Sequence, residues 1–215
     1  MRAILFDWDG TIVDSMPAIK EAEAELCRHV GIHFDDEVFR RTFSPNWRRL
    51  YRQLGIPPER DDEVAAVWVS NFRPELVQPF PGVGEAIGRL ADAGYALGLV
   101  TGGDRAGIEP QLKRTGFDRL ITVRVYADDT TAGKPDPRPL LLALERAGLE
   151  GGDHACYVGD ALDDMRMAAS AGVRGVGIVS MVATAEDLIG AGAAEAAGSV
   201  VEWTKRFLAE RARGR

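Results

Sequence analysis

The sequence predicts an α/β protein, a Rossmann-like parallel sheet with an inserted helical bundle. Strand and helix patterns alternate from residue 81 onward, and this alternation is typical of a parallel sheet with right-handed crossovers. Residues 15–80 contain helix patterns and no strand pattern, and a short apolar run at residues 3–6 precedes them. We therefore expect a core domain of residues 1–14 and 81–215 and a helical cap domain of residues 15–80.

The bulk composition disfavours several classes of partner. The chain has 215 residues, 46% of them hydrophobic and 27% charged, which is normal for a soluble globular protein. A formal net charge of -7 disfavours nucleic acid, because phosphate backbones need a basic surface. No apolar run approaches the roughly 20 residues that span a bilayer, and because a core-like strand stands at the start of the sequence, we expect no signal peptide. We expect a cytoplasmic protein, monomer or homodimer, with no nucleic-acid or membrane partner. Cys27 and Cys156 are expected to be free thiols, and a disulfide between them is the alternative.

The first strand, residues 3–6, is apolar throughout, as expected of a strand buried on both faces. It is followed by Asp7 and Asp9, which would point to the same side if the strand persisted, and by Gly10, which allows a sharp turn. Two carboxylates at such a strand end need a cation or a shared proton. Mg²⁺ suits them, because it takes oxygen ligands and leaves room for a substrate phosphate. The alternative is an acidic turn without a ligand.

The segment after this turn predicts four cap helices. An apolar stripe of Ile19, Ala22 and Leu26 indicates a helix over residues 17–30, and Gly31 ends it. The other three helices are expected at residues 35–43, at 46–54 with Asn46 as the cap and Gly55 as the stop, and at 59–77, where Pro74 can kink or shorten the helix.

The remaining elements of the core follow from apolar runs separated by caps and glycines. Strands are expected at residues 95–100, 120–126, 154–158 and 173–179. Helices are expected at residues 82–93, 104–114, 136–147, 162–171 and from Ser199, the last one fraying into residues 211–215. Residues 184–198 are rich in Ala and Gly and predict only weak helix.

Three of the predicted strands end in polar or acidic residues, namely Asp7, Thr101 and Asp160. Ligands of parallel sheets bind beyond the carboxyl ends of the strands, near the switch in strand order. The three side chains are therefore expected to meet at one site. Because the cap follows directly from the first of these strand ends, it would cover the site as a lid.

Taken together, these segments resemble the haloacid dehalogenase superfamily, most of whose members are phosphatases. The helical insertion is similar to the cap of its phosphoglycolate phosphatase-like branch. The resemblance covers nearly the whole chain, and its four motifs occur in the expected order. They are Asp7-Trp8-Asp9-Gly10-Thr11-Ile12-Val13-Asp14, Thr101 after the 97–100 strand, Lys134 in Gly133-Lys134-Pro135-Asp136-Pro137, and Gly159-Asp160-Ala161-Leu162-Asp163-Asp164.

The resemblance implies a covalent mechanism with Mg²⁺ as cofactor. Asp7 would be the nucleophile and form an aspartyl-phosphate. Asp9 would protonate the leaving group and then activate water. The metal would be held by the Asp7 carboxylate, the Asp9 backbone carbonyl and Asp160, and would shield the repulsion between nucleophile and phosphate.

The resemblance also implies the groups that bind the phosphate. Thr101 would donate its hydroxyl to a phosphoryl oxygen, and Lys134 would offset the negative charges. Backbone N–H groups near Gly10 and Gly102 would add donors, and Asp164 would be a supporting acid.

Two positions depart from the family pattern. Asp163 stands where the family often has a small or polar residue, and we interpret it as a solvated acid of the turn, outside the metal shell. Gly102 stands where Asn is frequent, which removes a side-chain contact and leaves substrate orientation open.

Other charged residues of the cap carry weaker signals. Arg48, Arg49 and Arg52 form a basic cluster, with Arg48 and Arg52 on one helix face. A solvated face is the favoured interpretation, and binding of an acidic leaving group is the alternative. His29 and His33 lack metal-ligand spacing, so surface or packing roles are expected.

The sequence predicts an Mg²⁺-dependent phosphatase of a small phosphorylated metabolite, phosphoglycolate-like or a sugar phosphate. A sugar-phosphate mutase of the β-phosphoglucomutase kind uses the same motifs and remains an alternative. A phosphonate hydrolase would need a cap lysine, and Lys20 is the only one in residues 15–80. Asp9 argues against a halide-releasing dehalogenase, and the complete acid set argues against a binding module on a retained scaffold.

Overall fold

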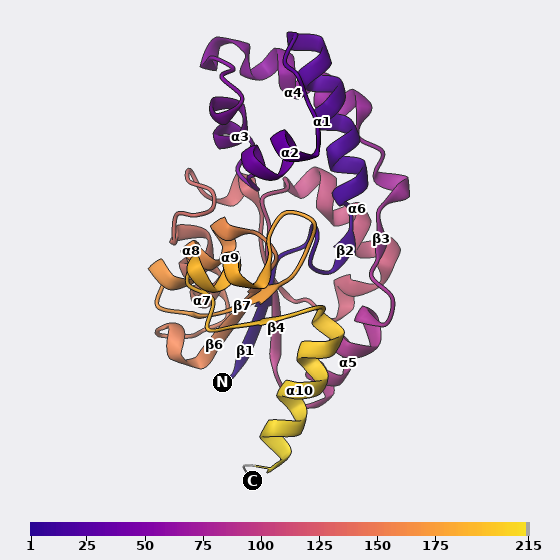
Figure 1. Ribbon diagram of the computed structural model, residues 1–215. Coiled ribbons are helices and arrows are strands. Elements are labelled where there is room, and N and C mark those ends of the chain that lie inside the picture. Colours follow the sequence, from indigo (N-terminus) through magenta and orange to yellow (C-terminus); the bar gives the residue numbers. More distant parts are fainter. Residues whose placement is uncertain (214–215) are drawn as a thin grey trace.

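The computed structural model describes residues 1–213 and contains a six-stranded parallel sheet (Figure 1). The strand order is β5-β4-β1-β6-β7-β8, so the first strand lies in the middle of the sheet. The predicted α/β class is confirmed. The strands are β1 (Ala3–Phe6), β4 (Ala96–Val100), β5 (Val123–Val125), β6 (Ala155–Gly159), β7 (Arg174–Ile178) and β8 (Glu195–Ala197).

Helices cover both faces of the sheet (Figure 1). On β1, Ile4 and Phe6 pack into the apolar cluster of one face, and Ala3 and Leu5 pack into that of the other. This alternation explains why the strand is apolar at every position. One face carries α5 (Val83–Asp92), α6 (Arg105–Thr115) and α10 (Val200–Arg213), and the other carries α7 (Arg138–Arg146), α8 (Leu162–Ser170) and α9 (Ala185–Gly190).

Residues 15–80, which we call the cap, lie beyond the carboxyl ends of the strands (Figure 1). The helices are α1 (Met16–Val30), α2 (Asp36–Thr42), α3 (Trp47–Gln53) and α4 (Asp61–Asn71). Asp35 and Asn46 cap α2 and α3 by accepting backbone N–H groups. The cap has its own apolar cluster, made of residues between Leu26 and Trp68. The division into two domains remains a prediction.

The two ends of the cap are tied together by a short ribbon, β2 (Val13–Asp14) paired antiparallel with β3 (Gln78–Pro79). The Phe80 N–H also donates to the Ile12 carbonyl at 3.0 Å. The expectation that residues 15–80 hold no strand was therefore wrong, because a strand of two residues is too short to show a period-two pattern.

The last cap helix is shorter than predicted. It ends at Asn71 rather than at residue 77, because Phe72 is extended and Pro74 follows, which disfavours helical backbone at Arg73. A 3₁₀ turn, Pro74–Leu76, leads from there to the ribbon.

Two regions of the core also differ from the prediction. Within residues 184–198 the helix α9 is followed by a strand, β8, whose Glu-Ala-Ala sequence has low strand propensity. The predicted 120–126 strand is reduced to β5, after a 3₁₀ turn at Phe117–Arg119. The expected fraying of the last helix extends to residues 214–215, which lie outside the described residues.

Both cysteines, Cys27 and Cys156, are buried and free, as expected. Among residues 1–213, no helix combines the length and apolar character needed to cross a bilayer.

Candidate active site

The register of the central strands brings the predicted motifs together. Phe6, the last residue of β1, is level with Leu99 of β4 and Val158 of β6. The following residue, Asp7, donates its N–H to the Val158 carbonyl at 2.8 Å. The residues that follow β4 and β6 are Thr101 and Asp160, so three motifs converge on one edge of the sheet, as predicted. The cap lies at this edge (Figure 1).

Three buried carboxylates form the centre of the site. Asp7, Asp160 and Asp164 each offer an oxygen that lies within 4.8 Å of the other two. Asp160 Oδ1 accepts the Thr11 hydroxyl at 3.3 Å. Its other oxygen, Oδ2, is buried without a hydrogen-bond partner among the described residues. A buried carboxylate oxygen without a hydrogen-bond partner is costly, so the arrangement needs either a bound cation or a proton.

Lys134 supplies one cation to this cluster. Its ammonium lies 2.7 Å from Asp7 Oδ1 and 2.8 Å from Asp164 Oδ1, and the side chain is 2% exposed. Burial opposes the charge of Lys134, but the two carboxylates outweigh it and hold its pKa above the usual range. Among residues 1–213, this ammonium is the cation paired with the cluster of three acids, so the site is short of positive charge.

The pKa values of the acids are raised, which is consistent with the shortage of positive charge in the site. Burial raises the pKa of Asp7, and its neighbours Asp164 and Asp9 add to the effect, while Lys134 opposes it. Burial also raises the pKa of Asp160 well above its usual range, with further contributions from Asp7 and Asp164. An oxygen-only donor set with one unpartnered oxygen fits a hard divalent cation, which would reverse these shifts.

Asp164 connects the fourth motif to Lys134. Its Oδ2 accepts the Ala161 N–H at 3.0 Å at the start of α8, and its Oδ1 accepts the Tyr157 hydroxyl at 3.1 Å. A Cβ at Gly159 would lie 2.5 Å from Asp164 Oδ2, so this position must be glycine. The sequence interpretation missed Tyr157, because a tyrosine inside an apolar strand gives no signal other than core packing.

The loop after β1 is a tight turn. The Trp8 carbonyl accepts the N–H groups of Thr11, Ile12 and Val13, at 3.3, 2.9 and 3.1 Å. Gly10 is left-handed at φ 71°, and a Cβ there would overlap Asp160 Oδ2. The turn thus requires glycine for both its backbone and its closeness to the carboxylates.

Asp9 lies on this turn but outside the cluster of three carboxylates. It is half-buried, and burial raises the pKa of its carboxyl while Lys134 opposes the shift. The structure therefore separates the two acids of the first motif, one inside the carboxylate cluster and one beside it.

Thr101 and Gly102 follow β4 directly. Thr101 is buried, and its Oγ1 accepts the Gly103 N–H at 3.0 Å, which leaves the hydroxyl proton available to donate. A Cβ at Gly102 would overlap the carbonyl oxygen of Pro45, in the cap between α2 and α3. The departure from the family's Asn thus has a structural reason, because the cap backbone occupies the space.

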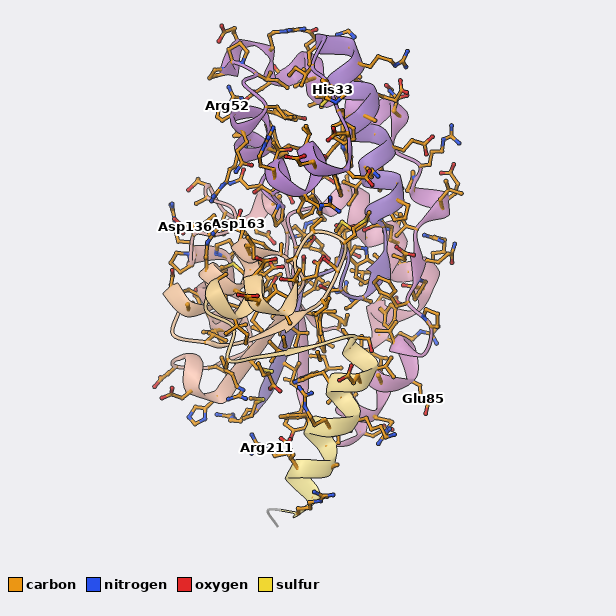
Figure 2. All side chains as sticks on the ribbon, in the orientation of Figure 1. His33, Arg52, Glu85, Asp136, Asp163 and Arg211 are labelled. Atoms are coloured by element: carbon orange, nitrogen blue, oxygen red, sulfur yellow. The ribbon has the colours of Figure 1, made fainter. Side chains whose placement is uncertain are left out.

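The interpretation of Asp163 as a solvated acid was wrong. Asp163 is 4% exposed and accepts the Ser44 hydroxyl at 2.9 Å. Its Oδ1 lies 3.3 Å from Arg49 Nη1 and 3.1 Å from Arg166 Nη1. Figure 2 shows Asp163 where the cap meets the core. The local pattern could not reveal this, since the cap partners are more than 110 residues away in the sequence.

The three arginines of the basic cluster in the cap have different surroundings. Arg48 is exposed and its guanidinium lies 4.0 Å from the centre of the Trp47 ring. Arg52 pairs with Asp61 within the cap. The prediction of a solvated helix face agrees with the surroundings of Arg48 and Arg52. It is wrong for Arg49, which forms an ion pair with Asp163 of the core.

Comparisons with known proteins agree with the motifs. Residues 4–178 match the model of the haloacid dehalogenase-like hydrolase family. The pyrophosphatase PpaX of Bacillus velezensis is 32% identical over 194 residues, covering 87% of this chain and 88% of its own. A phosphoglycolate phosphatase of Escherichia coli O157:H7 is 30% identical over 208 residues, covering 83% and 81%.

Among solved structures, a candidate β-phosphoglucomutase from Thermotoga maritima superposes with a TM-score of 0.72. It is 27% identical, and the match covers 98% of this chain and 99% of that protein.

Proposed function

Because the chain belongs to the haloacid dehalogenase-like hydrolase family, we propose that it is an Mg²⁺-dependent phosphatase of a small phosphorylated metabolite. It is a hydrolase of the phosphatase class, in the branch that includes phosphoglycolate phosphatases. The observation that carries the proposal is the buried cluster of three carboxylates with a single lysine, at the ends of adjacent parallel strands.

The donor set fits Mg²⁺. The Asp7 and Asp160 carboxylates and the Asp9 backbone carbonyl would hold the ion, which when bound supplies the positive charge that lets a carboxylate approach a phosphate ester. Asp164 is in the same cluster, but its oxygens already accept from Tyr157 and the Ala161 N–H and pair with Lys134. We therefore assign Asp164 the role of holding Lys134 in place.

Asp7 attacks phosphorus and forms an aspartyl-phosphate. Its position at the end of a central strand fixes the carboxylate, so the attacking oxygen needs little reorganisation. Lys134 lies against the nucleophile and offsets the charge of the transferring group, while Thr101 donates its hydroxyl to a phosphoryl oxygen. The predicted backbone donor near Gly10 is not supported, because the Gly10 N–H donates to the Val13 carbonyl at 2.9 Å and the Thr11 N–H to the Trp8 carbonyl. The Gly102 N–H is the backbone group that we assign to the phosphate.

Asp9 serves as the acid and then as the base. The leaving alkoxide needs a proton in the first step, and the water that hydrolyses the aspartyl-phosphate must lose one in the second. A carboxyl whose pKa is raised by burial holds a proton at higher pH than an exposed aspartate, which suits the first task. Asp9 lies beside the carboxylate cluster rather than in it, so its carboxyl can transfer protons while Asp7 acts as the nucleophile.

The mutase alternative rests on the shared motifs and on the Thermotoga structure. Incubation with a hexose 1-phosphate decides between the two, because a mutase yields the 6-phosphate and a phosphatase yields free sugar and inorganic phosphate. The phosphonate alternative needs the Lys20 amine to form an imine with substrate, and borohydride trapping at Lys20 tests it.

The test is a panel of phosphoglycolate, sugar phosphates, nucleotides and pyrophosphate, ranked by kcat/KM with Mg²⁺ and with excess chelator. We expect release of inorganic phosphate that stops with chelator and returns with Mg²⁺. Activity indifferent to chelator would remove the metal from the proposal. Absence of phosphate release from every member of the panel would overturn the proposed function.

A further inference from the structure

One short segment of the cap, residues 44–46, contacts three separate parts of the core. The Pro45 carbonyl lies where a side chain at Gly102 would be, and the Asn46 amide lies 3.2 Å from the position of a Cβ at Gly133. Ser44 donates to Asp163. Gly102 follows the phosphate-binding threonine and Gly133 precedes Lys134. The segment therefore lies against both phosphate-binding motifs.

Among these contacts, only that of Asp163 is electrostatic. The carboxylate accepts the Ser44 hydroxyl and faces the Arg49 guanidinium from the cap, and it faces Arg166 from its own helix. The Asp163 side chain is 5% exposed and that of Arg49 is 38% exposed, so the pair is largely shielded from water on the acid's side. Opening of the cap would break the Ser44 hydrogen bond and the Arg49 ion pair together, and of these partners only Arg166, on the same helix, would remain beside Asp163.

We infer that Asp163 is a positioning residue that holds the cap closed over the site through Ser44 and Arg49. Asp163 lies one residue before Asp164, which holds Lys134, so one turn of α8 carries both the contact to the cap and the contact to the phosphate-binding lysine. Closure of the cap and arrangement of the site thus depend on the same short stretch of backbone. The kinetic consequence of this inference rests on the proposed function, whereas the structural consequence does not.

Hydrogen–deuterium exchange of the full chain tests the inference without any substrate. In Asp163→Ala and Arg49→Ala we expect the amides of residues 44–53 to exchange about tenfold faster, with the central strands unchanged. Two controls are matched to these changes. Arg166→Ala removes an ion pair of the same carboxylate within the core, and Arg52→Ala removes an arginine of the same cap helix that pairs within the cap.

Kinetics with p-nitrophenyl phosphate and Mg²⁺ provide the second readout. Because the cap would open more readily, we expect kcat/KM to fall about tenfold in Asp163→Ala and Arg49→Ala, mainly because KM rises. In the two controls we expect kcat/KM to change less than about twofold. Arg49→Lys should recover part of the loss, because it keeps the charge. If wild-type protein releases no p-nitrophenol, the proposed function fails while the exchange experiment still tests the contact.

Unchanged exchange of residues 44–53 in both Asp163→Ala and Arg49→Ala would overturn the inference, and so would equal acceleration in Arg52→Ala. If Asp163→Ala accelerates exchange in the central strands as well, it has lost the fold, and Ser44→Ala and Arg49→Ala then decide. These two substitutions lie in the cap and leave every residue of the core in place.

Discussion

Buried carboxylates occur both in the core and in the cap, and their surroundings differ. In the core, Asp7 and Asp164 share the Lys134 ammonium. In the cap, Glu23 of α1 is 2% exposed, and its Oε2 has no hydrogen-bond partner in the described part of the chain. Burial raises the pKa of Glu23 to about 8. The core arranges its acids around positive charge, whereas the cap keeps its acid neutral.

This difference shows that burial alone does not identify a functional acid. Both regions raise the pKa of a carboxyl by desolvation, but among residues 1–213 several acids converge on one point beside a lysine only in the core. The geometry of the partners, rather than the size of the shift, separates a candidate metal site from an isolated buried carboxyl.

The substitution Asp7→Asn tests the proposed role of the core carboxylates and has the largest expected effect. The amide has the same shape but is a poor nucleophile, so we expect kcat with p-nitrophenyl phosphate to fall by on the order of 10⁴-fold or more. Circular dichroism should show the fold retained, since the substitution lowers charge repulsion in the cluster. Near-wild-type turnover without deamidation would show that Asp7 is not the nucleophile.

The charge deficit of the core predicts that Mg²⁺ stabilises the folded protein. At a hundredfold excess over the dissociation constant, binding adds about 2.7 kcal/mol to the free energy of unfolding. In Asp160→Asn the unpartnered carboxylate oxygen is lost, so we expect greater stability without metal and a much smaller response to Mg²⁺. Thermal melts with and without the ion measure both, and an equal response in the two proteins would contradict the ligand assignment.

The contact between the two regions is tested by Gly102→Ala. The added Cβ would overlap the Pro45 carbonyl, which is backbone and has little room to move, so the cap must shift outward. We expect kcat/KM to fall about tenfold to a hundredfold. Gly88→Ala in α5 is the matched control, because a Cβ there meets nothing within 4 Å. Equal activity of the two variants would show that the close approach at Gly102 has no role.

The cap side of the comparison predicts a pH dependence of stability. Between the usual glutamate pKa of 4.5 and the folded value of about 8, only the folded protein holds the Glu23 proton. The free energy of unfolding therefore falls as pH rises through this window, by about 1.4 kcal/mol per pH unit from this group.

Urea unfolding at several pH values measures this slope. Glu23→Gln should remove the contribution, because the amide does not titrate, and the exposed Glu21→Gln on the same helix should leave the slope unchanged. A slope that persists in Glu23→Gln would assign the pH dependence to other groups.

The sequence was most informative where chemistry coincides with the end of a strand. Asp7, Thr101 and Asp160 each follow an apolar run, and parallel topology brings such positions to one edge, so their convergence was predictable. Lys134 lies in a loop, and only the resemblance to a family indicated it. The catalytic roles of all four residues remain predictions.

Contacts between distant segments were not predictable from local patterns. Asp163 and Arg49 each had a plausible solvated interpretation, and their pairing depends on how the cap sits on the core. The strand β8 was missed because Ala has low strand propensity and the pairing with β7 decides its conformation. Glu23 follows Ile19 by four residues and precedes Leu26 by three, so the helical spacing places it on the buried stripe, but its charged residue type favoured an exposed position.

The ribbon of β2 and β3 places the entry and the exit of the inserted helices side by side. When a segment leaves and returns at one point, a change in its length costs little free energy of folding. Recombination at this junction would therefore exchange the whole insertion at one point of the chain, provided that the new segment reproduces the contacts of residues 44–46 and Arg49 with the core.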